Sequence, residues 1–289
     1  MKLESSELIL NADKSIYHLN LLPEDIANTV ITVGDPDRVS EVSKHFDSIE
    51  LKKGKREFIT HTGVLNGKRI SVVSTGIGTD NIDIVLNELD ALVNIDFDKR
   101  EVKEKHTQLD IIRIGTSGAI QPHIPIDSFL LSEYAIGFDS LLRFYDAESI
   151  LDDKIQDRFI AHTQWSKHKS TPYVVNFDAD LASIIDSELL VKGFTATNVG
   201  FYGPQGRKLR LKTEDENLNS KLASFEYNGL NITNLEMETS GIYGLSKLLG
   251  HRAVSLNCIV ANRSTGEFSA TPTKSIETLI QYTLKKLTE

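Results

Sequence analysis

Short runs rich in β-branched residues alternate with longer stretches of helical periodicity, and this alternation restricts the fold more than any other feature of the chain. Apolar residues recur at helical spacing over residues 81–93, whereas residues 30–33, 109–114 and 252–260 form short apolar runs. Alternation of these two patterns is typical of an α/β fold, in which helices cover a sheet. No Pro/Gly/Ser-rich linker divides the chain. We therefore expect one domain over residues 1–289, built around one central sheet.

Local signals predict where several elements begin and end. Asp35-Pro36 suits a helix N-cap followed by proline at the first helical position, with the helix continuing to about residue 46. Asn66-Gly67 separates two strand-like runs, residues 57–65 and 68–74, which predicts a tight hairpin. Further strands are expected at residues 128–136, 193–199 and 231–235, and further helices at residues 239–249 and 273–287.

Composition excludes several classes of protein. A chain of 289 residues, 40% of them hydrophobic, can bury a large core without disulfides. The net charge of −9 argues against a nucleic-acid-binding surface, which requires a basic face. The single cysteine, Cys258, lies in an apolar run and is expected to be a buried small hydrophobe. One cysteine cannot form an internal disulfide, which favours a reducing compartment. The first residues do not resemble a signal peptide, and no run approaches the ~20 apolar residues of a membrane helix, so we expect a cytoplasmic protein.

Two segments combine glycine with arginine in a way that suits phosphate. One runs from Gly34 to Arg38. The other runs from Arg113 to Thr116 and enters an expected small-residue loop over residues 115–118. Glycine lets the backbone approach an oxyanion, and arginine offers a charged fork that matches phosphate oxygens. Both junctions should lie beyond the carboxyl ends of strands, where α/β sheets bind ligands. Each junction alone is weak, because the first is also a good helix cap with no ligand.

A third segment could recognise a planar base. Gln205 offers an acceptor and donors, Arg207 offers donors, and together they complement an imide such as uracil. Phe201 could stack on a ring. The same residues also fit an ordinary glycine-proline loop with an exposed arginine.

The segment Glu236-Met237-Glu238 follows an expected strand and could hold a sugar. If the chain is still extended there, the two carboxylates share a face and can bind vicinal hydroxyls. If it is already helical, they diverge and are merely favourable at a helix N-terminus.

Several motifs of other enzyme classes are missing from the sequence. It contains no GxxxxGK[ST], HExxH, GxSxG or CxxC, and its eight histidines show no metal-ligand spacing. Kinase, zincin and serine-hydrolase functions lose support, and no metal is expected.

The four candidate segments occur together, in this order, in one known family. The chain resembles the hexamer-forming nucleoside phosphorylases, and most closely the uridine phosphorylases. The matching segments are VGDPDRV, KREFIT, STGIGT, RIGTSGAIQPHI, FYGPQGR, NLEMET and CIVANR. They span nearly the whole chain. The resemblance implies a single α/β domain with a mixed sheet, assembled as dimers and often hexamers, that uses inorganic phosphate as co-substrate and no cofactor.

The resemblance also implies roles for individual residues. The phosphate-binding residues are Gly34, Arg38, Arg113 and Thr116, with Arg56 reaching in from the neighbouring subunit. The ribose-binding residues are Ser117, Glu236, Met237 and Glu238, with His18 reaching the 5′-hydroxyl across the same interface. The base-binding residues are Phe201, Gln205 and Arg207. Arg113, Arg207 and Glu238 are the expected catalytic residues.

The implied reaction is phosphorolysis of uridine to uracil and ribose 1-phosphate, and three alternatives stay open. Purine-specific relatives place an aspartate after the last core strand, where this chain has Ala261-Asn262-Arg263. An amide cannot protonate a leaving purine, although it could still bind a 6-oxopurine. A nucleosidase that uses water would not need the arginine set, and a non-catalytic nucleoside-binding protein would not need every site residue.

The sequence departs from the family pattern in three places. Residues 203–205 read Gly-Pro-Gln where close relatives have another order, which leaves the loop shape open. Residues 78–81 replace a segment that helps hold a monovalent cation in some relatives, so we claim no such ion. Residues 94–108 are inserted relative to shorter members and are polar enough to be a solvated excursion. The preference among uridine, thymidine, deoxyuridine and inosine, and the choice between dimer and hexamer, stay open.

Overall fold

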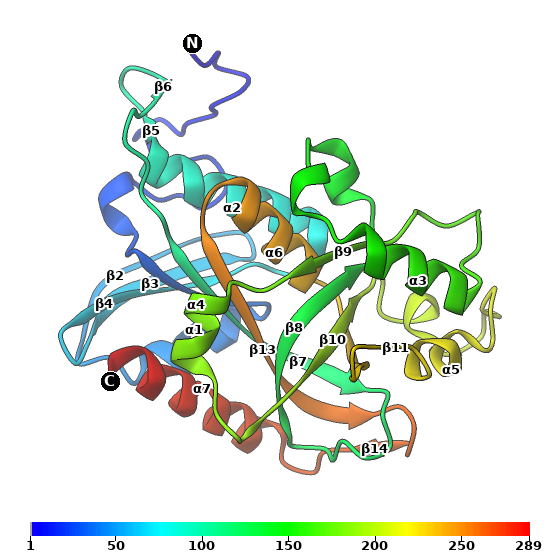
Figure 1. Cartoon of the computed structure of the whole chain (residues 1–289). Coiled ribbons are helices and arrows are strands. Elements are labelled where there is room, and N and C mark those ends of the chain that lie inside the picture. Colours follow the sequence, from blue (N-terminus) through cyan, green and yellow to red (C-terminus); the bar gives the residue numbers. More distant parts are fainter. Residues whose placement is uncertain (1) are drawn as a thin grey trace.

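A computed structural model describes residues 2–289 as a mixed β-sheet covered by helices (Figure 1). The longer strands are β1 (Thr29–Val33), β2 (Ser48–Lys55), β3 (Phe58–Leu65), β4 (Lys68–Ser74), β7 (Asp110–Ala119), β8 (Phe129–Gly137), β9 (Tyr173–Asn176), β10 (Leu190–Thr197), β12 (Leu230–Glu236) and β13 (Arg252–Asn262). The short strands are β5 (Ile95–Asp96), β6 (Glu101–Val102), β11 (Glu226–Tyr227) and β14 (Glu267–Phe268). The α-helices are α1 (Pro36–Ser43), α2 (Thr79–Asn94), α3 (Asp153–Thr163), α4 (Ala179–Ile185), α5 (Leu218–Ala223), α6 (Thr239–Leu248) and α7 (Pro272–Thr288). Short 3-10 turns lie at Pro23–Asp25, Leu141–Phe144, Glu148–Ile150 and Gly203–Gln205.

The sheet is long, mixed and partly closed on itself. Its strands follow the order β11-β12-β10-β8-β13-β7-β1-β4-β3-β2. β1 runs parallel to β4 and β7, whereas β3 runs antiparallel to β2 and β4. β12 also pairs antiparallel with the end of β7, which closes a ring of β7, β13, β8, β10 and β12. The expectation of a single α/β domain with a mixed sheet is confirmed.

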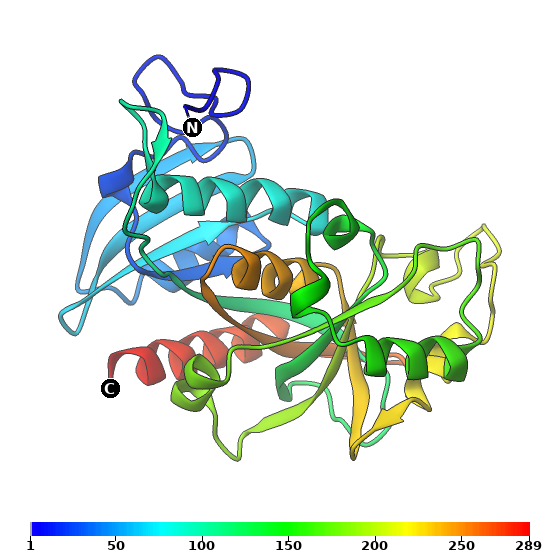
Figure 2. The same ribbon diagram turned by 45° about the horizontal axis from the view of Figure 1, so that its top comes forward.

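Helices cover both faces of the central strands. Val30 and Ile111 pack into a cluster with α2 and α6, whereas their chain neighbours Ile31 and Ile112 pack into another with α1, α4 and α7. This alternation follows from the two-residue period of a strand. Figure 2 shows α2 and α7 on opposite sides of the central strands. Within residues 2–289, no helix has the length and apolar character that crossing a bilayer requires.

Most of the local expectations agree with the structure. The side chain of Asp35 accepts from the backbone N–H of Asp37 and caps α1, which ends at Ser43, three residues before the expected boundary. Asn66 and Gly67 have φ angles of 49° and 77° and join Leu65 to its partner Lys68 in a tight hairpin. Cys258 is fully buried, as expected.

Two segments differ from the expectation. Residues 115–118 belong to β7 and are not a loop, because they pair with β13 on one side and, at the end, with β12 on the other. The polar excursion over residues 94–108 is largely exposed or half-buried, but it contains the small hairpin of β5 and β6.

Candidate active site

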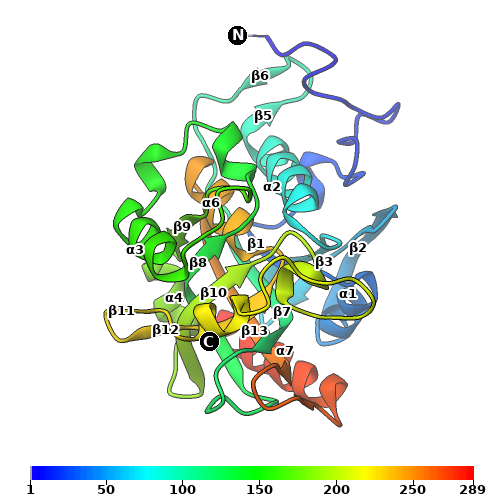
Figure 3. The same cartoon turned by 90° about the vertical axis from the view of Figure 1, so that its right-hand side faces the viewer.

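Four segments that are far apart in the sequence line one cavity of about 760 Å³. They are the junction of β1 with α1, the second half of β7, the loop after β10, and the junction of β12 with α6. Figure 3 shows the loop that joins β10 to α5 on the same side of the molecule as α1 and β7. The candidate residues that line the cavity are Gly34, Arg38, Arg113, Thr116, Ser117, Phe201, Gln205, Arg207, Glu236, Met237 and Glu238.

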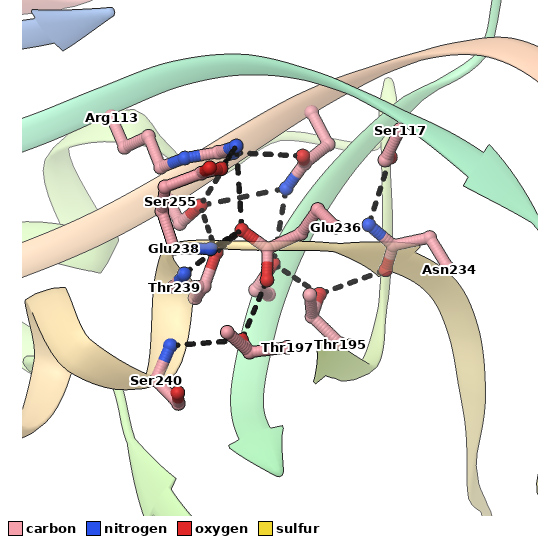
Figure 4. Close-up of polar contacts among 12 residues, drawn as sticks. Arg113, Ser117, Thr195, Thr197, Asn234, Glu236, Glu238, Thr239, Ser240 and Ser255 are labelled. Atoms are coloured by element: carbon pink, nitrogen blue, oxygen red, sulfur yellow. Dashed lines mark hydrogen bonds and ion pairs between the residues drawn. The ribbon is translucent and has the colours of Figure 1, made fainter. Parts of the chain in front are cut away.

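Arg113 lies in the floor of this cavity, and its side chain is held from two sides. It is only 5% exposed, and its guanidinium folds back over the Cα of Gly115 on the same face of β7. Nη1 donates to Asn257 Oδ1 at 2.9 Å, and Nη2 donates to Glu238 Oε2 at 2.6 Å (Figure 4). A Cβ at residue 115 would overlap the Arg113 guanidinium. Glycine is therefore required here to leave room for that side chain, and not because of its own backbone torsion.

Glu236 and Glu238 converge on Arg113 because the chain turns between them. Glu236 is the last residue of β12 and Glu238 is the N-cap of α6, so neither the fully extended nor the fully helical expectation applies. Their Oε2 atoms lie 3.3 Å and 2.6 Å from Arg113 Nη2. The structure therefore places an ion-paired triad where the sequence predicted two ribose-binding carboxylates.

The carboxylate of Glu236 is fully engaged by protein groups. Its Oε1 accepts from Thr197 Oγ1 at 2.6 Å, and its Oε2 accepts from the backbone N–H groups of Glu238 and Thr239 at 2.9 and 2.8 Å. These bonds satisfy the first N–H groups of α6. Glu236 thus holds the start of α6, whereas Glu238 accepts from Arg113 with one oxygen and from the backbone N–H of Gly78 at 2.8 Å with the other.

The electrostatics of the triad follow from its burial. Burial alone would lower the pKa of Arg113, but Glu236 and Glu238 outweigh burial and raise it. Burial raises the pKa of Glu238, and the attraction of Arg113 offsets only part of that effect. The floor therefore already carries two carboxylates for one guanidinium, so binding an anion there needs a further cation.

Arg38 supplies that cation at the end of the cavity formed by α1. Its Nε is buried, and within residues 2–289 this atom has no hydrogen-bond partner. Burial lowers the pKa of Arg38, and the nearby Arg113 lowers it further. A buried, unpaired guanidinium N–H beside a second guanidinium is suited to an anionic ligand.

At the opposite end, Gln205 and Arg207 meet in the loop after β10. Gln205 is 3% exposed, and its Oε1 accepts from Arg207 Nη1 at 2.6 Å. The guanidinium of Arg207 lies 3.7 Å from the centroid of the Phe201 ring, so it covers one face of that ring and leaves the other for a ligand. Burial and the nearby Arg263 lower the pKa of Arg207 to about 10. Two guanidiniums that repel each other here would be stabilised by negative charge on a bound base.

Arg263 is a site residue that the sequence analysis missed. It follows β13, its Nη2 lies 3.5 Å from the carbonyl oxygen of Gly206, and its buried Nη1 has no partner within the described chain. The only indication in the sequence was that Arg263 ends CIVANR, one of the segments that carry the family resemblance. Nothing in the sequence distinguishes it from an exposed arginine at a strand end.

Asn262 faces away from the cavity. Its Nδ2 donates to the carbonyl oxygens of Gln121 and Ile124 at 3.0 and 2.8 Å, and its Oδ1 accepts from the backbone N–H of Ser264 at 2.8 Å. The side chain therefore fixes two loops. In this position it neither touches a base nor supplies a proton.

His18 and Arg56 lie outside the cavity of their own chain. Arg56 is exposed at the turn between β2 and β3, with φ at 57°. The His18 ring is 6.2 Å from the ring of Phe58, two residues beyond Arg56, and its Nδ1 is 2.7 Å from Glu88 Oε1. His18 thus lies beside the strand that follows Arg56, and neither candidate lines the cavity, although Glu57, next to Arg56, does.

Metal-binding side chains do not cluster in the part of the chain that the structure describes. Among residues 2–289, no three His, Cys, Asp or Glu side chains gather closely enough to hold an ion. At the cavity wall, Glu57 stands beside Asn81, with 3.5 Å between Oε1 and Nδ2.

The comparisons with known proteins identify a phosphorylase family, which agrees with a cavity lined by arginines. A model of the phosphorylase superfamily matches residues 28–287, and the chain belongs to that superfamily. A uridine phosphorylase of Thermococcus kodakarensis is 30% identical over 94% of this chain and 87% of its own length. One of Haemophilus influenzae is 28% identical over 87% of this chain and 88% of its own. The solved structure of a Trypanosoma brucei nucleoside phosphorylase, described as showing uridine phosphorylase activity, superposes with a TM-score of 0.87 at 30% identity, covering 97% of this chain and 99% of that one.

Proposed function

We propose that this protein cleaves uridine with inorganic phosphate to give uracil and ribose 1-phosphate, in the salvage or breakdown of pyrimidine nucleosides. The observation that carries the proposal is that one cavity brings phosphate-matching and base-matching side chains together. Arg38 and Arg113 line it from α1 and β7, Gln205 and Arg207 line it from the loop after β10, and Glu238 lines it while bonded to Arg113. A nucleoside and a phosphate can occupy these places side by side. The relatives that are uridine phosphorylases support the same substrate.

The proposed mechanism follows from two charges that develop as the glycosidic bond breaks. The sugar becomes cation-like, as in glycoside hydrolysis, and phosphate held by Arg38 and Arg113 would offset that charge before bonding to the anomeric carbon. Glu238 would bind the ribose hydroxyls and keep the sugar above the phosphate. The electron pair of the broken bond passes to the base, where Gln205 and Arg207 would stabilise the anion until it takes up a proton, in net terms that of hydrogen phosphate, and leaves as uracil. Preorganised donors of this kind contribute roughly 3 kcal/mol each.

A specific observation supports a pyrimidine over a 6-oxopurine. Asn262 stands where a purine-specific relative carries its proton donor, and both ends of its amide are bonded to backbone groups away from the cavity. Gln205 and Arg207, in contrast, line the cavity, and although they bond to each other, the Gln205 amide N–H groups and the remaining Arg207 N–H groups can donate to the carbonyl oxygens of an imide.

We also propose that the complete site is shared between two subunits. Arg56 and His18 do not line the cavity of their own chain, and the family resemblance assigns both to the site of a neighbouring copy. Arg56→Ala and Arg113→Ala proteins should each be nearly inactive alone, and their mixture should recover some activity after subunit exchange. Mixed oligomers that show no recovery would count against a shared site.

A phosphate-dependence assay tests the main proposal. Uridine should be cleaved with phosphate or arsenate and hardly at all in phosphate-free buffer. The reason is that Arg38 and Arg113 bind and position an anion, whereas water carries no charge for them to bind. We propose that no metal is required, so excess EDTA in the same assay should leave the rate unchanged. Equal rates with and without phosphate would establish a hydrolase instead.

Composition and structure also support a proposed cytoplasmic location. The chain carries one cysteine, and it is buried in β13, so no internal disulfide marks an oxidising compartment. Fractionation of cells that express the protein would test this, and activity confined to a membrane or secreted fraction would contradict it.

A further inference from the structure

We propose that Asn257 is a positioning residue for phosphate, which it serves by holding Arg113 with a neutral acceptor. This inference rests on the proposed function, because phosphate is the ligand whose binding it affects. Asn257 lies in β13, is fully buried, and does not line the cavity. It acts through the guanidinium of Arg113, which does line the cavity.

The orientation of the Asn257 amide is determined by its surroundings. Oδ1 faces Arg113 Nη1 at 2.9 Å, and arginine has only donors to offer. Nδ2 lies 3.3 Å from Ser132 Oγ and 3.4 Å from Ser255 Oγ, both of which can accept. The reverse orientation would place the amide donors against the guanidinium. The oxygen must therefore point at Arg113.

The amide is anchored in a hydrogen-bond network that starts and ends at the cavity. From Asn257 it continues through Ser132 to Thr195, whose hydroxyls are 2.5 Å apart, and then to Asn234 Oδ1 at 2.8 Å. Asn234 Nδ2 donates to Ser117 Oγ at 2.9 Å, and Ser117 lines the cavity again. Figure 4 shows the last of these contacts, from Thr195 through Asn234 to Ser117. Asn257 therefore has little freedom to leave Arg113.

The charge of the residue at position 257 matters because the floor is already acidic. Arg113 from β7 faces Glu236 from β12 and Glu238 from α6, which gives one positive and two negative charges. The remaining titratable neighbour is Tyr243 of α6, whose hydroxyl donates to the carbonyl of Ser132 and accepts from the N–H of Ser255. A carboxylate in place of the amide would add a third negative charge and would oppose an anion bound at Arg113. An amide fixes Nη1 without that penalty.

The sharpest test is Asn257→Asp, which changes charge at nearly constant size. We expect the KM for inorganic phosphate in uridine cleavage to rise at least ~10-fold at pH 8, with a smaller change in kcat at saturating phosphate. The ratio of variant to wild-type KM should fall as the pH is lowered, because a protonated aspartic acid is neutral like the amide. Dividing by the wild type at each pH removes the titration of phosphate itself. Stabilisation of the folded protein by inorganic phosphate in a thermal shift assay should weaken in parallel.

Two further variants keep the test decisive. Asn231→Asp makes the same chemical change at a half-buried amide outside the cavity, which donates to the carbonyl of Phe225, and should leave the phosphate KM unchanged. Asn257→Ser removes the acceptor without adding charge and should raise the phosphate KM about threefold to tenfold, less than the full value of a charged hydrogen bond because Asn257 acts on phosphate only through Arg113.

The possible outcomes separate this inference from the proposed function. A wild-type phosphate KM in Asn257→Ser would overturn the positioning role, even if Asn257→Asp failed to fold. An equal effect of both substitutions with no dependence on pH would overturn the charge argument. A wild-type enzyme that needs no phosphate would refute the proposed function itself.

Discussion

The cavity floor, meaning Arg113, Glu236 and Glu238, and the base loop, residues 198–207, are built in opposite ways. The floor residues are 4–6% exposed and bond to side chains on other strands, whereas Phe201 and Tyr202 of the base loop are 51% and 54% exposed. Arg207 bonds mainly within its own loop, to Gln205 Oε1 and to the carbonyl of Phe201. Ribose and phosphate are the same for every ribonucleoside, but the base differs. A buried floor beside a loop whose aromatic residues are exposed therefore lets base preference change at Phe201 and Tyr202 without disturbing the fold.

The largest expected effect comes from removing the centre of the floor. Arg113→Ala should lower kcat/KM at least ~100-fold, because it removes a preorganised cation. It should also lower the free energy of unfolding by about 3–5 kcal/mol, because two buried carboxylates lose their partner. Steady-state kinetics and denaturant unfolding would measure the two effects. An inactive protein of unchanged stability would mean that the floor is not part of the framework.

A methyl group at Gly115 should damage the floor more gently. Gly115→Ala places a Cβ where the Arg113 guanidinium lies, so the guanidinium must move. We expect the KM for phosphate to rise ~10-fold and stability to fall by about 1–3 kcal/mol. The matched control is Gly203→Ala in the base loop, where a Cβ would meet no atom within 4 Å. Similar behaviour of the two variants would remove the contrast between floor and loop.

A substitution in the base loop should lower activity without lowering the stability of the fold. Arg207→Ala should lower kcat for uridine at least ~10-fold, since a charged hydrogen bond contributes ~1.5–3 kcal/mol and the charge on the base grows in the transition state. Stability should stay within about 0.5 kcal/mol of the wild type, and the phosphate KM should change little. Kinetics with uridine and inosine would check this. Uridine turnover that survives while inosine turnover collapses would favour a purine substrate.

The sequence predicted the participants of the site better than their arrangement. Local chemistry was sufficient for the Asp35 cap and the Asn66-Gly67 hairpin, since both depend on neighbours in the chain. The strand over residues 115–118 was missed because glycine, threonine and serine give no apolar run, and pairing with β13 and β12 decides their structure. Helix α3 was also missed, although Ile155, Phe159 and Thr163 recur at helical spacing and Asp152 caps its first turn.

The roles of Asn257 and Arg263 lay beyond sequence reasoning for a different reason. Asn257 sits in a run that predicts a buried strand, and only its partners Ser132 and Arg113 make it more than a satisfied core amide. Arg263 gains its significance from the loop that holds Arg207. Both depend on contacts across the sheet, which periodicity and spacing do not encode.

The closure of β7 against β13 also determines when the site can exist during synthesis. Arg113 and Asn257 are 144 residues apart, so the floor needs one strand from the middle of the chain and one made much later. Pairings of this separation form slowly, because a long segment must be ordered before any bond is gained. A nascent chain on the ribosome carries Arg113 without its Asn257 partner until β13 has emerged, although both glutamates are already made and β12 can pair with β7. The last long strand to be translated therefore supplies the neutral partner that completes the floor.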